Sequence, residues 1–379
     1  MTADRKTRRF LALGISAAAL VAMTTVALGQ DRAGGGGQAG QAPGGQGRGG
    51  GRGGQAAPPG PREVPARTIP IPDTVSPEMQ ALIGRGIGAT WNQELKTDED
   101  FAARAGRGGG AVGGIPPNQA TLDAMGVKAE AMTVNGIPGY MLTPNTIAPE
   151  NKDRLLMHVH GGCYVMGGGG TAEGVYMAGF GHIKVFSVDY RRPPSAFYPA
   201  ALDDVVNAWK GVIKMGDPKK MGMVGLSAGG ALVLSAVHRL KAEGVTLPAA
   251  IAPGTPMSDL TGKGDSMEVN KLVDNVLVGY GSCDAMGVFY AHGHDLKDPY
   301  LSPLYGDFKG FPPAILTTGT RDLLLSSTVR VHRKMRQAGV EASLQVFEGQ
   351  SHAQYNNATP EGKEAYEEIQ KFFDKHLGR

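Results

Sequence analysis

The chain has 379 residues, 41% of them hydrophobic and 19% charged, which is enough for one large α/β domain or two ordinary ones with a sizeable core. Its formal net charge of +3 is unevenly distributed. Residues 1–62 hold eight Lys or Arg and two Asp and so carry +6, which leaves −3 for residues 63–379. A body with a small negative charge has no general attraction to nucleic acid or anionic lipid, and we expect neither as a partner.

The N-terminus has the organisation of an export signal. A basic stretch at 4–9 precedes an apolar run over 10–28, and small residues at 27–29 would permit cleavage near Gln30. Residues 7–11, Thr-Arg-Arg-Phe-Leu, come close to a twin-arginine pattern, which would imply export of a folded protein. An uncleaved anchor is the alternative, but polar residues within the run weaken a spanning helix. We therefore expect a signal peptide over 1–29 and a secreted or periplasmic protein without stable membrane association after cleavage.

A glycine- and proline-rich segment follows at 30–72. Between residues 34 and 54, 13 of 21 residues are glycine, and such a sequence cannot bury enough apolar area to offset its ordering entropy. Its Arg-Gly pairs could bind RNA, but export makes that alternative improbable. We expect a disordered linker.

The body alternates short apolar runs with amphipathic stretches, which predicts a mostly parallel sheet with helices on both faces. A hairpin is expected first, around Asn135-Gly136. Strands are predicted at 154–160, 183–190, 220–225, 249–253, 314–319 and 343–348, with helices at 199–214, 228–243 and 326–338. A final helix should begin at Pro360 with Thr359 as its cap.

Two segments do not follow this alternation. We expect residues 73–129, with a helix starting at 76–78, and an insertion at about 258–300 to form a cap over the mouth of the sheet. The apolar residues that could line the cap, unless they are ordinary packing, are Met257, Met267, Leu272, Val276, Leu277, Val278 and Met286.

The sequence Gly-Leu-Ser-Ala-Gly-Gly at 225–230 joins a predicted strand to a predicted helix. A serine between glycines at such a turn is typical of an exposed nucleophile, although the motif alone could be a plain glycine-rich turn. His352 and Asp322 follow the last two strands, so the chain order Ser227, Asp322, His352 is that of nucleophile, acid and base. Taken singly, the histidine could be structural and the aspartate a helix cap; together they predict a catalytic triad at the strand ends.

A further strand ends in His-Gly-Gly-Cys at 160–163. Glycines there let backbone N–H groups face a ligand, so Gly161, Gly162 and Cys163, with the N–H of Ala228, are the candidate oxyanion hole. The second cysteine, Cys283, is 120 residues away, and nothing else suggests a disulfide framework. We expect the two thiols to be unpaired.

From about residue 130 to its end, the chain resembles the bacterial hormone-sensitive-lipase group (family IV) of α/β-hydrolase esterases. The motifs that carry the resemblance are HGGC at 160–163, VDYRRPPSAFYPAALDD at 188–204, GLSAGG at 225–230, DPYLSPLYGDFKGFPPAILTTGTRDLLL at 298–325 and VFEGQSH at 346–352. The resemblance implies an α/β-hydrolase catalytic domain over 130–379, with an eight-stranded sheet under a helical cap, the triad and oxyanion hole named above, and a possible homodimer. Three departures from the family pattern put substrate preference in doubt: Cys163 for a third glycine, Leu226 for an aspartate, and the absence of an acidic residue at 192–195.

These observations favour a serine carboxylesterase that hydrolyses small to medium esters through an acyl-enzyme, without a cofactor. A lactone hydrolase would use the same triad. A non-catalytic binding protein, as in the gibberellin receptors that resemble these esterases, is disfavoured by the retained His352, and a protease by the lack of a peptide subsite. The sequence His292-Gly-His-Asp295 permits a metal site, but its place before the 298–325 motif favours a connection between cap and core.

Overall fold

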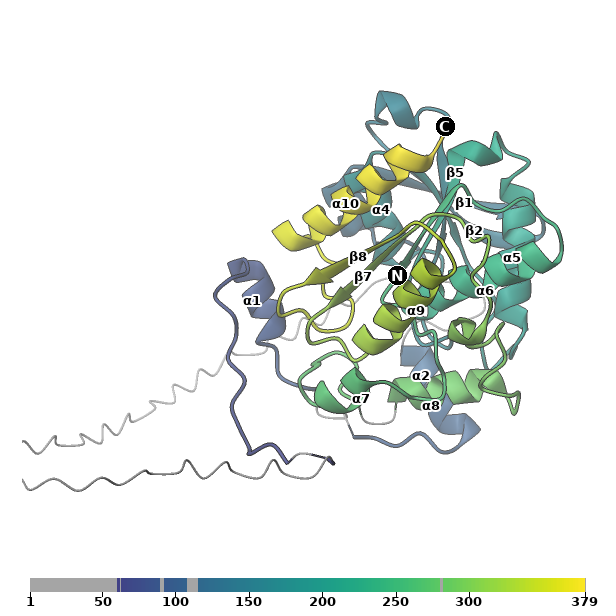
Figure 1. The fold of residues 1–379 in the computed structure, drawn as a ribbon. Helices are drawn as coiled ribbons and strands as arrows, with labels where there is room; N and C mark the ends of the chain where they lie inside the picture. Colours follow the sequence, from purple (N-terminus) through teal and green to yellow (C-terminus); the bar gives the residue numbers. More distant parts are fainter. Residues whose placement is uncertain (1–59, 62, 89–91, 108–114, 280–281, 379) are drawn as a thin grey trace, which may run out of the picture. The chain divides into compact units, whose positions relative to one another are not determined.

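The computed structural model describes residues 60–61, 63–88, 92–107, 115–279 and 282–378 (Figure 1). The predicted signal peptide at 1–29 and most of the predicted linker lie outside these residues. The chain divides into two units, 1–65 and 66–379, and the fold below is that of the second. Within the described part, no helix combines the length and the apolar character needed to span a membrane.

Eight strands form one sheet in the order β1-β2-β4-β3-β5-β6-β7-β8. β1 and β2 are a hairpin closed by Asn135-Gly136, β2 runs antiparallel to β4, and all other neighbours are parallel. The bounds are β1 Val127–Val134, β2 Ile137–Pro144, β3 Leu155–Val159, β4 Lys184–Val188, β5 Met221–Leu226, β6 Ala250–Gly254, β7 Ala314–Gly319 and β8 Ala342–Phe347. The predicted hairpin, strands and α/β class are confirmed.

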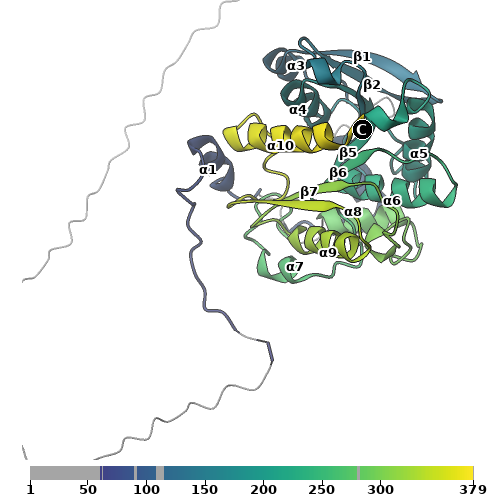
Figure 2. The same cartoon turned by 45° about the horizontal axis from the view of Figure 1, so that its top comes forward.

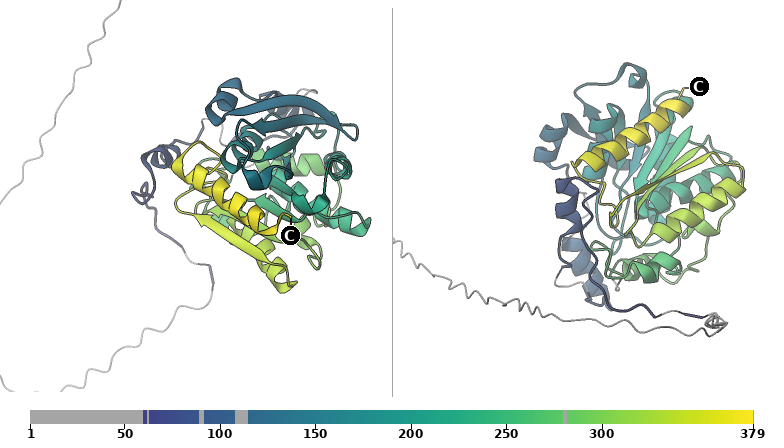
Figure 3. Two further views of the ribbon diagram at one scale, coloured as in Figure 1. Left: turned by 90° about the horizontal axis from the view of Figure 1, so that it is seen from above. Right: turned by 60° about the vertical axis from the view of Figure 1, so that its left-hand side comes forward.

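Helices cover both faces of this sheet (Figures 2 and 3). One apolar core lies between the sheet and α4 and α10, and the other between the sheet and α5, α6 and α9. The bounds are α1 Pro77–Ile83, α2 Asp98–Arg107, α3 Gln119–Met125, α4 Ala172–Gly181, α5 Ala200–Val212, α6 Ala228–Ala242, α7 Asp265–Val269, α8 Ser282–Ala291, α9 Leu325–Gln337 and α10 Pro360–His376. Thr359 caps α10 and Ser76 caps α1, as the sequence predicted.

α4 is a helix that the sequence did not predict. Its ten residues include Gly174, Gly179 and Gly181, and six of the ten are buried, so the segment has almost no alternation of polar and apolar faces. Its glycines permit close packing: a Cβ at Gly179 would lie 2.7 Å from Cε of Met125. The helix matters for the site because its first turn carries Glu173.

Candidate active site

Ser227 occupies the sharp turn between β5 and α6. Its backbone has φ 60° and ψ −121°, a strained conformation for a residue with a side chain. The turn needs glycine on both sides, because a Cβ at Gly225 would lie 2.6 Å from the carbonyl oxygen of Gly229, and one at Gly229 would lie 2.0 Å from that of Val159. This crowding explains why small residues surround the one hydroxyl group.

His352 and Asp322 meet Ser227 at the carboxyl ends of the parallel strands. His352 Nε2 is 3.0 Å from Ser227 Oγ, and His352 Nδ1 is 3.1 Å from Asp322 Oδ1. All three side chains are at least 95% buried, so the two hydrogen bonds lie in a medium of low polarity. The three residues predicted from separate motifs thus form one hydrogen-bonded chain, with the geometry of a serine hydrolase triad.

Hydrogen bonds keep the carboxyl group of Asp322 ionised. The hydroxyl groups of Thr255 and Thr318 and the N–H of Leu324 donate to Asp322, the last two at 3.0 and 2.8 Å. Burial acts to raise the pKa of Asp322, but the charge of His352 and these hydrogen bonds outweigh it and hold the pKa below its ordinary value. Burial acts to lower the pKa of His352, yet Asp322, with smaller contributions from Asp274 and Glu173, raises it above its ordinary value.

Asp274 supports the triad from the 258–300 insertion, and no motif pointed to it. Its side chain is fully buried. One carboxylate oxygen accepts the N–H groups of Leu323 at 2.9 Å and His352 at 3.2 Å, and the other accepts those of Val276 at 2.8 Å and Leu277 at 3.1 Å. Burial, and secondarily the neighbouring Asp322, raise the pKa of Asp274. One carboxylate therefore joins the insertion to the two loops that carry the acid and the base.

The four predicted oxyanion residues are not equivalent. The N–H of Gly161 donates to Glu173 at 3.0 Å, whereas the N–H groups of Gly162, Cys163 and Ala228 are hydrogen-bonded to no other described residue. The last three are therefore free to donate to an oxyanion, while Gly161 permits close approach: its Cβ would lie 3.3 Å from that of Ser227.

The segment after β4 packs against residues 160–164, the loop after β3 that we call the oxyanion loop. The ring of Tyr190 stacks on that of His160 at 4.0 Å, and its hydroxyl donates to the carbonyl of His160 at 3.0 Å. Arg192 donates to Asp189 at 2.8 Å and to the carbonyl of Tyr190 at 2.7 Å. Burial, with the charge of Arg192, puts the pKa of His160 well below its ordinary value, and its Nδ1 lies 2.7 Å from the carbonyl oxygen of Gly161. Tyr190 and Arg192 of the Tyr-Arg-Arg motif thus contact the oxyanion loop, whereas Arg191 pairs with Asp204 on α5 at 2.7 Å.

The expectation of two free thiols is wrong. Cys163 and Cys283 form a disulfide, which joins the oxyanion loop to α8. Spacing along the chain could not reveal it, because only the fold brings α8 over the end of β3. Gly162, Cys163 and Tyr164 all have positive φ, at 108°, 52° and 65°. For Cys163 and Tyr164 this conformation costs about 1–3 kcal/mol each.

Two helices from the segments predicted as a cap are in contact. The ring of Phe101 on α2 stacks on that of Phe289 on α8 at 4.1 Å, so the two helices lie side by side (Figure 1). Of the expected lining residues, Met257, Val278 and Met286 are buried and Met267 and Leu277 partly so, whereas Leu272 and Val276 are about half exposed.

No group of three or more metal-ligating side chains occurs among the residues that the structure describes. The two histidines of the 292–295 sequence contact aromatic rings instead, His292 on Phe197 at 4.2 Å and His294 against Tyr198 at 4.9 Å. Leu226, where the family has an aspartate, packs with Tyr355 and Ala365.

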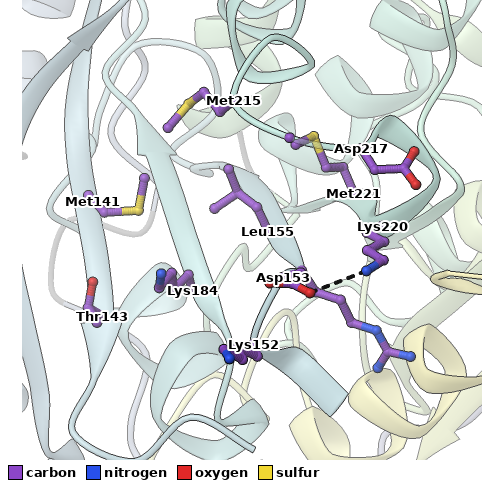
Figure 4. Close-up of a pocket in the computed structure, with 12 residues that line it drawn as sticks. Met141, Thr143, Lys152, Asp153, Leu155, Lys184, Met215, Asp217, Lys220 and Met221 are labelled. Atoms are coloured by element: carbon purple, nitrogen blue, oxygen red, sulfur yellow. Dashed lines mark hydrogen bonds and ion pairs between the residues drawn. The ribbon is translucent and has the colours of Figure 1, made fainter. Parts of the chain in front are cut away.

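A separate pocket of about 520 Å³ lies at the opposite edge of the sheet, where β3, β4 and β5 begin (Figure 4). Methionine and leucine side chains form part of its wall, and Lys220 pairs with Asp153 at 3.4 Å across its rim. No triad residue lines it, so it is distinct from the candidate active site.

Several known proteins are similar to this chain in sequence. A model of the α/β-hydrolase fold family matches residues 156–356. An acetyl-hydrolase of Streptomyces hygroscopicus is 29% identical over 231 residues, which are 59% of this chain and 77% of that protein. An esterase of Acinetobacter venetianus is 29% identical over 234 residues, or 59% and 76%.

Solved structures of esterases superimpose on this chain. The crystal structure of an esterase E25 superimposes with a TM-score of 0.77 at 36% identity, covering 84% of this chain and 99% of that one. An esterase from the bacterial hormone-sensitive-lipase family does so with a TM-score of 0.66 at 28% identity, covering 80% and 99%. The chain belongs to the α/β-hydrolase fold family. Within it, the chain is a carboxylic ester hydrolase of the bacterial hormone-sensitive-lipase group, as its motifs predicted.

Proposed function

We propose that Ser227, His352 and Asp322 are the catalytic residues of a serine carboxylesterase for small to medium esters. The observation that carries this proposal is the continuous chain of hydrogen bonds, 3.0 Å from Ser227 Oγ to His352 Nε2 and 3.1 Å from His352 Nδ1 to Asp322 Oδ1. A protein that only binds a ligand has no need of a base in contact with its serine. Catalysis is therefore preferred over the non-catalytic alternative.

The residues support the following course of reaction. Ser227 Oγ attacks the ester carbonyl while its proton moves to His352 Nε2, and the carbonyl oxygen becomes an oxyanion that accepts from the N–H groups of Gly162, Cys163 and Ala228. His352 gives the proton to the departing alkoxide, which leaves an acyl group on Ser227. Water, deprotonated by His352, then attacks the acyl-enzyme and regenerates the serine. Asp322 stabilises the imidazolium of His352 during both acylation and deacylation.

We propose that the enzyme prefers esters with a short acyl group. Support comes from relatives named for acetate chemistry, the Streptomyces acetyl-hydrolase and an ethyl acetate hydrolase of Pseudomonas putida, 26% identical over 226 residues.

We further propose an exported enzyme: residues 1–29 have the pattern of a signal peptide, and a disulfide is typical of oxidising compartments. A homodimer through the edge strand β8, where Val346 is 44% exposed, completes the proposal.

The test is turnover of p-nitrophenyl acetate, butyrate, octanoate and palmitate, with γ-butyrolactone as a lactone control. We expect kcat/KM to be highest for acetate or butyrate and to fall by about 10⁴-fold or more in Ser227→Ala. A folded wild type without turnover on any ester would contradict the proposal. Turnover of the lactone alone would assign the triad to lactone hydrolysis.

A further inference from the structure

We propose that Cys283 and Tyr290 of α8 are positioning residues of the reaction, because they clamp the oxyanion loop in the conformation that exposes its N–H donors. This inference rests on the function proposed above. It concerns two side chains that belong neither to the triad nor to the oxyanion loop.

Two consecutive loop residues are tied to one face of α8. Cys163 is bonded to Cys283, and the ring of Tyr164 stacks on that of Tyr290 at 4.5 Å with an interplanar angle of 2°. Residues 283 and 290 are seven apart, or two helical turns, and therefore project from the same side of the helix. The loop is thus held by a covalent tie and a ring contact on adjacent residues.

The loop needs such ties because its own backbone disfavours the observed conformation. Gly162, Cys163 and Tyr164 lie in succession at positive φ, and two of them carry a Cβ. The turn itself supplies only the hydrogen bonds from the N–H groups of Val165 and Met166 to the carbonyl of Gly162, at 3.0 and 2.8 Å. Without α8 the loop would relax, and the free N–H groups of Gly162 and Cys163 would lose their present directions.

α8 is itself well anchored, as a clamp requires. Phe289 stacks on Phe101 of α2, and the carbonyl of Tyr290 accepts the N–H of Tyr198 at 3.0 Å. A second path runs through Met257, whose N–H donates to the carbonyl of Ser227 at 3.1 Å and whose carbonyl accepts the hydroxyl of Tyr164 at 3.3 Å. The nucleophile, the oxyanion loop and α8 are therefore connected by direct contacts.

The experiment compares the wild type with Cys163→Ala, Cys283→Ala and the double variant, and uses Val288→Ala as a matched control on the exposed side of α8. Thiol titration of the denatured wild type should find no free thiol among its two cysteines. At a temperature where every variant is folded, kcat per labelled serine should fall about tenfold in each single variant while KM changes little, because an oxyanion donor acts in the transition state. The double variant should lose no more than either single variant, since all three lack the same bond.

A readout independent of activity separates this inference from the proposed function. Amide hydrogen exchange of the peptide over 161–170 should accelerate in Cys283→Ala and not in Val288→Ala, while exchange in α6 stays unchanged. If exchange accelerates but the wild type hydrolyses no ester, the clamp stands and the proposed function fails. Two free thiols in the wild type, or a Cys283→Ala variant that loses thermal stability with unchanged kcat and loop exchange, would overturn the clamp.

Discussion

Asp274→Asn tests how the 258–300 insertion supports the catalytic loops. The substitution keeps the size of a fully buried side chain but replaces one accepting oxygen by an NH₂ group. In either orientation of the amide, two backbone N–H groups lose their acceptor: those of Leu323 and His352, or those of Val276 and Leu277. Each buried donor left without a partner costs about 1–3 kcal/mol, so the free energy of unfolding should fall by about 2–6 kcal/mol. Relief of the repulsion from Asp322 favours the lower end of that range.

The same variant should also change the pH dependence of activity. The charge of Asp274 contributes to the raised pKa of His352, so its removal should lower that pKa. His352 acts as a base only when neutral, and its neutral fraction grows as the pH rises through its pKa. The acidic limb of kcat/KM should therefore move to lower pH in Asp274→Asn.

The assays are urea unfolding followed by fluorescence and kcat/KM against pH with a p-nitrophenyl ester. Asp265→Asn is the matched control, because it removes the same charge from an exposed residue of the same insertion. A loss of less than about 0.5 kcal/mol, the range of ordinary surface substitutions, together with an unmoved acidic limb, would refute the structural role given to Asp274.

Three further predictions concern residues around the triad. Gly229→Ala should abolish soluble folded protein or lower its melting temperature strongly, because the new Cβ would lie 2.0 Å from a backbone oxygen of β3; Gly86→Ala, where nothing lies within 4 Å, is the control for thermal unfolding. Glu173→Gln should move the acidic limb of kcat/KM to lower pH, since the charge of Glu173 helps to raise the pKa of His352; an unmoved limb would contradict this. Thr255→Val should lower the free energy of unfolding by about 1.5–3 kcal/mol through loss of a hydrogen bond to the Asp322 carboxylate, and Thr255→Ser should retain most of that stability in urea unfolding.

The sequence was most informative where local chemistry is demanding. Parallel strands end at one edge of a sheet, so motifs after three predicted strands could be assembled into Ser227, Asp322 and His352 without coordinates. The glycines beside the serine also indicate the sharp turn, because the close approaches at Gly225 and Gly229 exclude a side chain.

What could not be predicted depends on contacts between distant segments. The separation of Cys163 and Cys283 along the chain did not indicate a disulfide, and their bond follows from the packing of α8 over the oxyanion loop. Glu173 lies on a helix without amphipathic periodicity, and Asp274 lies in an insertion without a motif. Each acts on the site through backbone N–H groups, which leave no mark on the side-chain pattern.

The identity of the nucleophile is tested most directly by reaction with a fluorophosphonate, followed by intact-mass and peptide mass spectrometry. Ser227 is activated by His352 at 3.0 Å, so we expect one adduct per chain, located on the peptide that contains residues 225–230, and none in folded Ser227→Ala. An adduct on another residue, or a folded wild type without any adduct, would contradict the assignment of Ser227 as the catalytic serine.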